Sequence, residues 1–373
     1  VTPDSMGRGS SGTGYVQYVD PRSAQVAAEQ MNNRVVLDRQ IRVSIAGLEK
    51  ASVSDTLCDI AIVEPIKSTP IDPPTMAITI GVNDSPLAGT EGSKVTSRMI
   101  RDRLFAEAET NVAIKVKESD AKDAFEVGGR GELQLGVLIE NMRREGYELG
   151  VSRPEVIMKE VDGEMHEPFE NVIFDVEEQH QGAVMEQLGF RKGEMTDMVV
   201  DGKGRIRIDA TVPSRGLIGF RSEFLTLTSG TGIMTSSFSH YAPMKSGGVA
   251  KRQNGVLVSM VQGKVLGYSL FNLQERGRLF VDPGIEVYEG MVIGLNARGD
   301  DMVVNPTKGK QLTNIRAAGT DENIVLTPPI KFTLERALEF IEDDELVEVT
   351  PQSIRIRKKY LTENERKRMG RSL

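Results

Sequence analysis

The sequence has few of the residues that build disulfides and metal centres. Its 373 residues include one cysteine, Cys58, three histidines and no tryptophan. A single cysteine cannot close a disulfide within the chain or form a metal cage alone, so we interpret Cys58 as a small core or half-buried residue. The histidines, which have no partner at a spacing suited to zinc, are expected to be structural or surface groups: His166, His180 and His240.

Long hydrophobic runs are also missing. The longest apolar stretches, such as 256–258 and 291–293, are far shorter than the roughly 20 residues that span a bilayer. No signal or transit pattern stands at the amino end. We therefore expect no membrane contact, and the low cysteine content fits a reducing compartment. The chain starts mid-pattern at Val1, as a fragment would.

Nucleotide-binding and catalytic motifs are absent as well. A phosphate loop requires Gly-x-x-x-x-Gly-Lys-Ser/Thr. Residues 89–94 have the wrong spacing, while Gly309-Lys310 is preceded by Val304 at the glycine position and followed by Gln311. Residues 7–12 match Gly-x-Gly-x-x-Gly, but the strand follows this segment instead of preceding it, which favours a flexible loop. With no Gly-x-Ser-x-Gly nucleophile and no convincing acid–base pair, we predict no catalysis and no cofactor for this chain.

The formal charge of −8 disfavours indiscriminate nucleic-acid binding, but it is unevenly distributed. An acidic run, 342–345, precedes a carboxyl-terminal segment that holds only two acidic residues, Glu363 and Glu365. The same segment holds eight basic residues: Arg355, Arg357, Lys358, Lys359, Arg366, Lys367, Arg368 and Arg371. Two interpretations remain open, a solvated tail or a phosphate-contacting segment.

The first 45 residues differ in pattern from the rest. Residues 12–18 and 41–45 alternate like strands, and a helical apolar face lies between them. This order resembles the second half of an RNA-recognition motif, with Tyr15 and Tyr18 as candidates for base stacking. Because the first half of the motif is absent, we expect residues 1–45 to be a partial motif, either a truncated or fused remnant or an RNA-binding segment. Four prolines then mark residues 46–74 as a linker.

Two α/β units are predicted next. From Thr75 the periodicity gives the order β-α-β-β-α-β over residues 75–162, and the same order repeats over residues 163–244. The clearest helical face consists of Leu135, Leu138, Ile139 and Met142. The expected fold class is therefore α+β, with two tandem ferredoxin-like domains.

A β-rich domain is predicted for residues 245–373. Short alternating runs separated by glycines are typical of strands, and residues 264–268 form one of them. A long polar loop spans 296–319, a length that indicates function or disorder. A short helix near Leu334 and a strand at 353–357 precede the basic segment.

Several long runs from about Gly47 onward resemble the BipA/TypA family of translational GTPases. They are Ser97-Arg98, Gly128–Leu133, Leu138–Gly146, Val176–Gly182, Pro213–Arg221, Lys251–Gly255 and Ala318–Glu322. The resemblance implies a GTPase domain and a β-barrel, two domains similar to domains III and V of elongation factor G, and a family-specific carboxyl-terminal domain. The resemblance implies that residues 46–74 include a barrel remnant as well as the linker. This sequence departs from the family pattern in its first 45 residues. GTP and Mg are therefore expected only for the GTPase domain, which is missing here.

The resemblance further implies partners. Family members bind the ribosome near its A site and assist large-subunit assembly and translation under stress, and a loop corresponding to 299–319 lies near the tRNA acceptor end. We therefore expect contacts with the ribosome, large-subunit rRNA and the tRNA acceptor end by a monomeric, cytoplasmic protein, with an organelle matrix or stroma as the alternative. The predicted RNA-binding residues are basic: Lys251, Arg252, Arg276, Arg278, Arg298, Lys308, Lys310, Arg316, Lys358 and Lys359.

Overall fold

The computed structural model describes residues 35–36, 39–40, 73–119, 121, 123–247, 252–309 and 324–370. The chain divides into two compact units, Val1–Ile71 and Asp72–Leu373. In the first, only the antiparallel pairing of β1 (Val35–Val36) with β2 (Arg39–Gln40) is described. The predicted partial RNA-recognition motif and linker, with Tyr15, Tyr18 and Cys58, otherwise lie outside the described residues.

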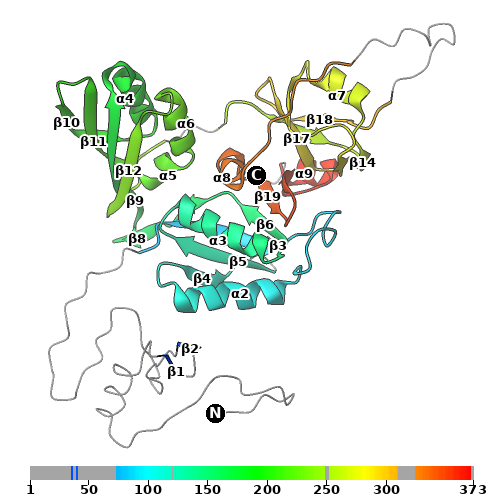
Figure 1. Ribbon diagram of the computed structural model, residues 1–373, viewed down its shortest axis with the longest axis horizontal. Helices are drawn as coiled ribbons and strands as arrows, with labels where there is room; N and C mark the ends of the chain where they lie inside the picture. Colours follow the sequence, from blue (N-terminus) through cyan, green and yellow to red (C-terminus); the bar gives the residue numbers. More distant parts are fainter. Residues whose placement is uncertain are drawn as a thin grey trace, which may run out of the picture. The chain divides into compact units, whose positions relative to one another are not determined.

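The first α/β region has the predicted order of elements. It forms an antiparallel sheet in the order β4-β5-β3-β6, with two helices (Figure 1). The Thr96 hydroxyl accepts the Met99 N–H and caps the first helix, and the four predicted inward residues of the second helix are buried. The elements are β3 (Met76–Val82), α2 (Ser97–Thr110), β4 (Lys115–Glu118), β5 (Ala124–Gly129), α3 (Glu132–Arg144) and β6 (Leu149–Ser152).

The second α/β region repeats this order, and its sheet runs β10-β11-β9-β12. Phe174, Phe220 and Phe224 form its aromatic centre, with ring centroids 5.5–6.1 Å apart. Its first strand, β9, is long, because its early residues pair with β8 (Lys159–Val161) and with β12. The main elements are β9 (Glu164–Glu177), α4 (Gln181–Phe190), β10 (Glu194–Val200), β11 (Arg205–Pro213), α5 (Ser214–Leu217), α6 (Phe220–Leu227) and β12 (Ile233–Pro243).

The carboxyl-terminal region is mixed, and two predictions for it were wrong. The predicted strand at 264–268 is interrupted, since β14 ends at Lys264 and α7 begins at Gly267. The predicted loop 296–319 contains a strand that pairs in parallel with β13. The elements are β13 (Val256–Ser259), β14 (Gly263–Lys264), α7 (Gly267–Leu273), β15 (Gly277–Leu279), β16 (Glu286–Val287), β17 (Met291–Asn296), β18 (Met302–Val304), α8 (Leu334–Phe340), β19 (Glu345–Val349), β20 (Ile354–Lys358) and α9 (Glu363–Met369).

One sheet connects the first α/β region with the carboxyl-terminal region. Strand β19 pairs antiparallel with β6, which gives the continuous order β18-β13-β17-β20-β19-β6-β3-β5-β4. Helices α3 and α8 are in contact, and a single hydrophobic cluster contains residues of both regions, from Ile78 to Ile356. The sheet therefore crosses segments that the sequence assigns to separate domains.

The described residues contain neither a membrane-spanning helix nor a cluster of metal-binding side chains. No helix there is long and apolar enough to cross a membrane. Among the same residues, no group of three or more His, Cys, Asp or Glu side chains is placed to hold a metal ion.

Candidate nucleic-acid interface

Three predicted RNA-binding arginines lie near one another in the carboxyl-terminal region. Arg276 and Arg278 flank the glycine that begins β15, and Arg298 follows β17. The Ala297 N–H donates to the Arg276 carbonyl at 2.8 Å, which brings the chain at Arg298 beside Arg276. A Cβ on Gly277 would stand 1.8 Å from the Leu295 carbonyl oxygen, so this close strand approach requires glycine.

These three guanidinium groups are available to a partner. Arg276, Arg278 and Arg298 are all exposed, and within the described part of the chain no ion pair or side-chain hydrogen bond involves any of them. A guanidinium with no carboxylate partner retains its donors for phosphate oxygens. We therefore treat Arg276, Arg278 and Arg298 as the candidate interface and call them the arginine patch.

Two further predicted cations, Lys308 and Lys359, are exposed, and Lys308 lies apart from the arginine patch. The segment after β18 leads to Lys308, and the Pro306 carbonyl accepts the Leu266 N–H at 3.0 Å at the start of α7. Because β13 and β18 run parallel, this segment lies at the opposite end of β13 from Gly255, whose N–H contacts the Arg298 carbonyl. The predicted residues Lys251, Lys310 and Arg316 lie outside the described residues.

The prediction that Lys358 contacts RNA was wrong for the folded chain. Its side chain is 3% exposed, and its Nζ lies 2.6, 2.8 and 3.0 Å from carboxylate oxygens of Asp301, Asp344 and Glu345. Burial acts to lower the pKa of Lys358, but these carboxylates outweigh burial and raise it. The residue belongs to the last sheet strand, β20, and stabilises the fold instead of reaching solvent.

Arg252 requires the same correction. Its guanidinium is 14% exposed, bonds to both Glu345 oxygens at 2.8 and 3.0 Å, and lies 4.4 Å from the Phe340 ring centroid. Although burial acts to raise the pKa of Glu345, the bond from Arg252 and the charge of Lys358 lower it. Two of the ten predicted contacts, Arg252 and Lys358, thus form one buried charge cluster around Glu345.

A second buried polar cluster was missed by the sequence interpretation. Glu348 in β19 is fully buried and accepts hydrogen bonds from Asn83, Ser85, Tyr288 and Arg355 at 2.6–3.1 Å. Burial, followed by the charge of Glu348, raises the pKa of the Tyr288 hydroxyl. Arg355 was expected in a basic tail, yet it holds the loop after β3 against the carboxyl-terminal region. No local sequence signal identifies such a partner, because Asn83 and Glu348 are far apart in sequence.

The loop after β3 is fixed by another buried carboxylate. Glu148 accepts the backbone N–H groups of Gly89, Glu91 and Gly92 at 2.8, 3.1 and 2.6 Å. Glu91 in turn forms an ion pair with Arg355. These bonds join the first α/β region to β20, beside the strand pairing of β6 with β19.

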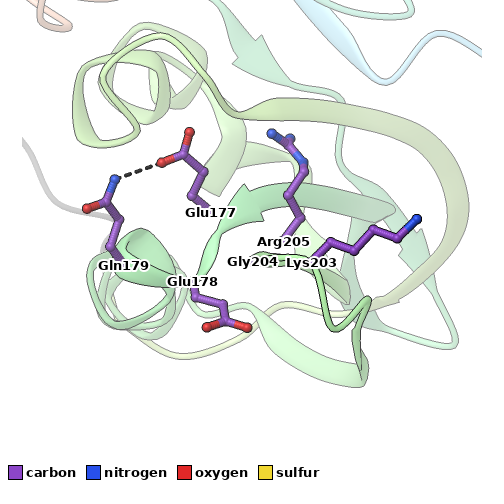
Figure 2. Close-up of a pocket in the computed structure, with 6 residues that line it drawn as sticks. All are labelled: Glu177, Glu178, Gln179, Lys203, Gly204 and Arg205. Atoms are coloured by element: carbon purple, nitrogen blue, oxygen red, sulfur yellow. Dashed lines mark hydrogen bonds between the residues drawn. The ribbon is translucent and has the colours of Figure 1, made fainter.

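An open depression of about 440 Å³ lies at one end of the second sheet, where β9 ends and the β10–β11 turn begins. Figure 2 shows the Glu177 and Gln179 side chains joined by a hydrogen bond, which is 2.7 Å long, and Glu178 pointing away from Glu177. Arg205 bonds Asp175 at 2.7 Å. The lining charges are therefore satisfied by neighbours or directed to solvent, and they form no nucleophile–base arrangement.

Comparison with known proteins places this arrangement in a family. Residues 254–363 match the family described as TypA/BipA C-terminal domain, and residues 164–251 match the family described as elongation factor G C-terminus. A Haemophilus influenzae protein named large ribosomal subunit assembly factor BipA is 60% identical over 330 residues, which cover 88% of this chain and 54% of that protein. The Escherichia coli K12 protein of the same name is 59% identical over the same shares. The chain belongs to the TypA/BipA family.

The family resemblance predicted from the sequence is thus confirmed. The chain spans about half the length of the relatives that it matches, 54% of each. The TypA/BipA C-terminal match covers the strands from β13 to β20, including the arginine patch. A Thermus thermophilus crystal structure aligns with a TM-score of 0.32 at 14% identity, over 48% of this chain and 42% of that one, too distant to inform the fold.

Proposed function

We propose that this chain is the ribosome-contacting part of a TypA/BipA protein and that its arginine patch binds large-subunit rRNA. The observation that carries the proposal is the 60% identity to a protein named large ribosomal subunit assembly factor. The exposed, unpaired state of Arg276, Arg278 and Arg298 within the described residues supports a phosphate-rich partner. The tRNA acceptor end near the A site is the second proposed contact.

The same proposal extends to the architecture. Both α/β regions have the order β-α-β-β-α-β and corresponding strand orders, so we infer two ferredoxin-like domains in tandem. The match of residues 164–251 to the elongation factor G C-terminus supports the second. In this proposal they hold the carboxyl-terminal region in position on the ribosome.

We further propose that the full-length protein is a GTPase that uses GTP and Mg in a domain outside this chain. It would act as a monomer in the bacterial cytoplasm during large-subunit assembly. The 373 residues contain no phosphate-loop sequence. Their own contribution to the cycle is therefore binding, not hydrolysis.

Co-sedimentation with isolated large ribosomal subunits tests the arginine patch. We expect the wild-type chain to pellet with the subunits, and Arg276→Glu, Arg278→Glu and Arg298→Glu together to weaken binding at least tenfold, because each reversal replaces attraction to phosphate with repulsion. A matched control changes three exposed cations elsewhere, Arg98, Lys115 and Lys203, to glutamate. Equal binding by both triple variants would refute the patch.

The alternative proposal, an RNA-binding protein that acts through residues 1–45, is not favoured by the comparisons. The relatives are 59–60% identical to this chain over 330 residues, and their names describe large ribosomal subunit assembly. Deletion of residues 1–45 separates the two. Ribosome binding is expected to survive the deletion, and its loss would favour the alternative.

A further inference from the structure

A hydrogen bond from a backbone N–H of the second α/β region connects it to a helix of the first. The N–H of Gly219, in the loop between α5 and α6, donates to Oε1 of Glu132 at 3.1 Å. Glu132 is the first residue of α3. Gly219 has φ +71°, a conformation that favours glycine. Its neighbour Ile218 packs on the hydrophobic cluster that the first and carboxyl-terminal regions share.

The same loop also meets helix α8 of the carboxyl-terminal region. A Cβ on Gly219 would stand 3.6 Å from the Cβ of Glu339, and Glu339 forms a hydrogen bond with Ser222 at the start of α6. The segment 218–222 therefore reaches both α3 and α8, and Glu132 and Glu339 lie on either side of it.

The charges at this contact are unbalanced. Besides Glu132 and Glu339, the negative groups are Glu170 on β9, Glu335 on α8 and Glu223 on α6, whereas the positive groups are Arg191 and Arg336. The Arg191 guanidinium is occupied by Glu223 and by the Gly216 carbonyl at 2.7 Å. Glu132 thus has one N–H donor and no ion-pair partner among the described residues. A buried carboxylate in that position is costly when ionised.

We propose that the segment 218–222 is a clasp that docks the second α/β region on α3 and α8 while Glu132 or Glu339 carries a proton, and that it loosens when both are ionised. When the clasp is closed, at least one of the two carboxyl groups, that of Glu132 or that of Glu339, must be neutral. When the clasp is open, water hydrates both carboxylates. The second α/β region can then move relative to the sheet that joins the first α/β region and the carboxyl-terminal region. This goes beyond ribosome binding, because it concerns how the binding surfaces are held relative to one another.

The direction of the pH effect follows from the site. Burial, followed by the charge of Glu339, raises the pKa of Glu132 to about 7, and burial raises the pKa of Glu339. Because the pKa of the carboxyl group is raised in the closed state, its protonation stabilises that state. This contribution is fully present below the ordinary pKa of 4.5 and is lost as the pH rises toward 7. Since one pKa unit corresponds to a tenfold change in equilibrium, we expect the closed-to-open ratio to fall on the order of a hundredfold by pH 8.5.

Distance measurement between spin labels tests the clasp in the full chain. Labels on Glu109→Cys in α2 and Ser236→Cys in β12, in a Cys58→Ser background, report on the two regions without touching the contact. We expect one narrow distance distribution at pH 5.5 and a broadened one at pH 8.5, with a midpoint near 7. Glu132→Gln keeps an acceptor oxygen but cannot ionise, so its distribution should stay narrow throughout.

Two further variants complete the test. Glu339→Gln should also suppress the broadening, while Glu155→Gln, an exposed control, should behave as wild type. Circular dichroism at both pH values monitors folding of every variant. A wild-type distribution that ignores pH, or a full transition that persists in folded Glu132→Gln and Glu339→Gln, would overturn the proposal.

Discussion

Val347 in β19 pairs with Val151 in β6, and both side chains are fully buried. Through this pair, β19, a strand near the carboxyl end, extends the sheet of the first α/β region beyond β6. The carboxyl-terminal region therefore depends on the first α/β region for a strand neighbour and for part of its core. The carboxyl-terminal region also has a cluster of its own, which extends from Leu257 to Val304. The second α/β region shares no strand with the other two and has both its own sheet and its own hydrophobic cluster.

This dependence predicts different behaviour of isolated pieces. Residues 163–244 should unfold in one cooperative urea transition, because their core is self-contained. Residues 245–373 alone should unfold at lower urea concentration and less cooperatively, because β19 keeps β20 but loses its other partner, β6, and the apolar surface that the first α/β region covers is exposed. Circular dichroism and urea titration measure both. A sharp transition of 245–373 alone would show that the shared sheet is unnecessary for folding.

Local patterns explain which parts of the fold were predictable from sequence. The helix α3 was predicted because Leu135, Leu138 and Met142 follow helical spacing and need no distant information. The pairing of β6 with β19 was not predictable, since register between distant strands leaves no local signal. Lys358 was misinterpreted for a related reason. A run of cations is typical of a solvated segment, and the sequence does not show that the distant Asp301 forms an ion pair with Lys358. The exposure of Arg276, Arg278 and Arg298 was predictable, because exposure is the ordinary state of arginine. Their contact with RNA stays a prediction.

Lys358→Met tests the buried charge cluster. Removing the cation leaves Glu345, which is fully buried, with one fewer partner. Loss of one partner from a buried pair is expected to cost about 3–5 kcal/mol of unfolding free energy. Chemical denaturation measures it. Lys117→Met, which removes an exposed partner of Glu126, is the control and should change stability little. If the two variants lose the same stability, the cluster is not a stabilising contact.

Gly290→Ala tests a close backbone approach. Gly290 has φ +90°, and an added Cβ would stand 2.7 Å from both the Cα and the carbonyl oxygen of Leu361. The matched control is Gly284, with φ +84° and no atom within 4 Å of the added Cβ. Both variants incur backbone strain of about 1–3 kcal/mol, so Gly290→Ala should be the less stable one by its additional steric clash. Thermal melting of both variants gives the comparison, and equal melting temperatures would mean that the segment at Leu361 moves freely aside.

Protonation of Glu148 is expected to make the contact between the first α/β region and the carboxyl-terminal region sensitive to acid. Burial acts to raise the pKa of Glu148, but the N–H groups of Gly89 and Gly92 and the amide of Asn83 lower it below 4.5. Such a carboxylate contributes stability above its ordinary pKa, and this contribution is lost as pH falls through the lower, folded-state pKa.

The unfolding free energy should therefore decrease between pH 5 and pH 3, and Glu148→Gln should reduce the slope of that decrease because its side chain takes up no proton in this range. Urea denaturation across this range measures the slope, and the exposed Glu109→Gln serves as the control that keeps it. An unchanged slope in Glu148→Gln would assign the acid sensitivity to other carboxylates, since the loop from Gly89 to Gly92 would then stay in place whether or not Glu148 carries a charge.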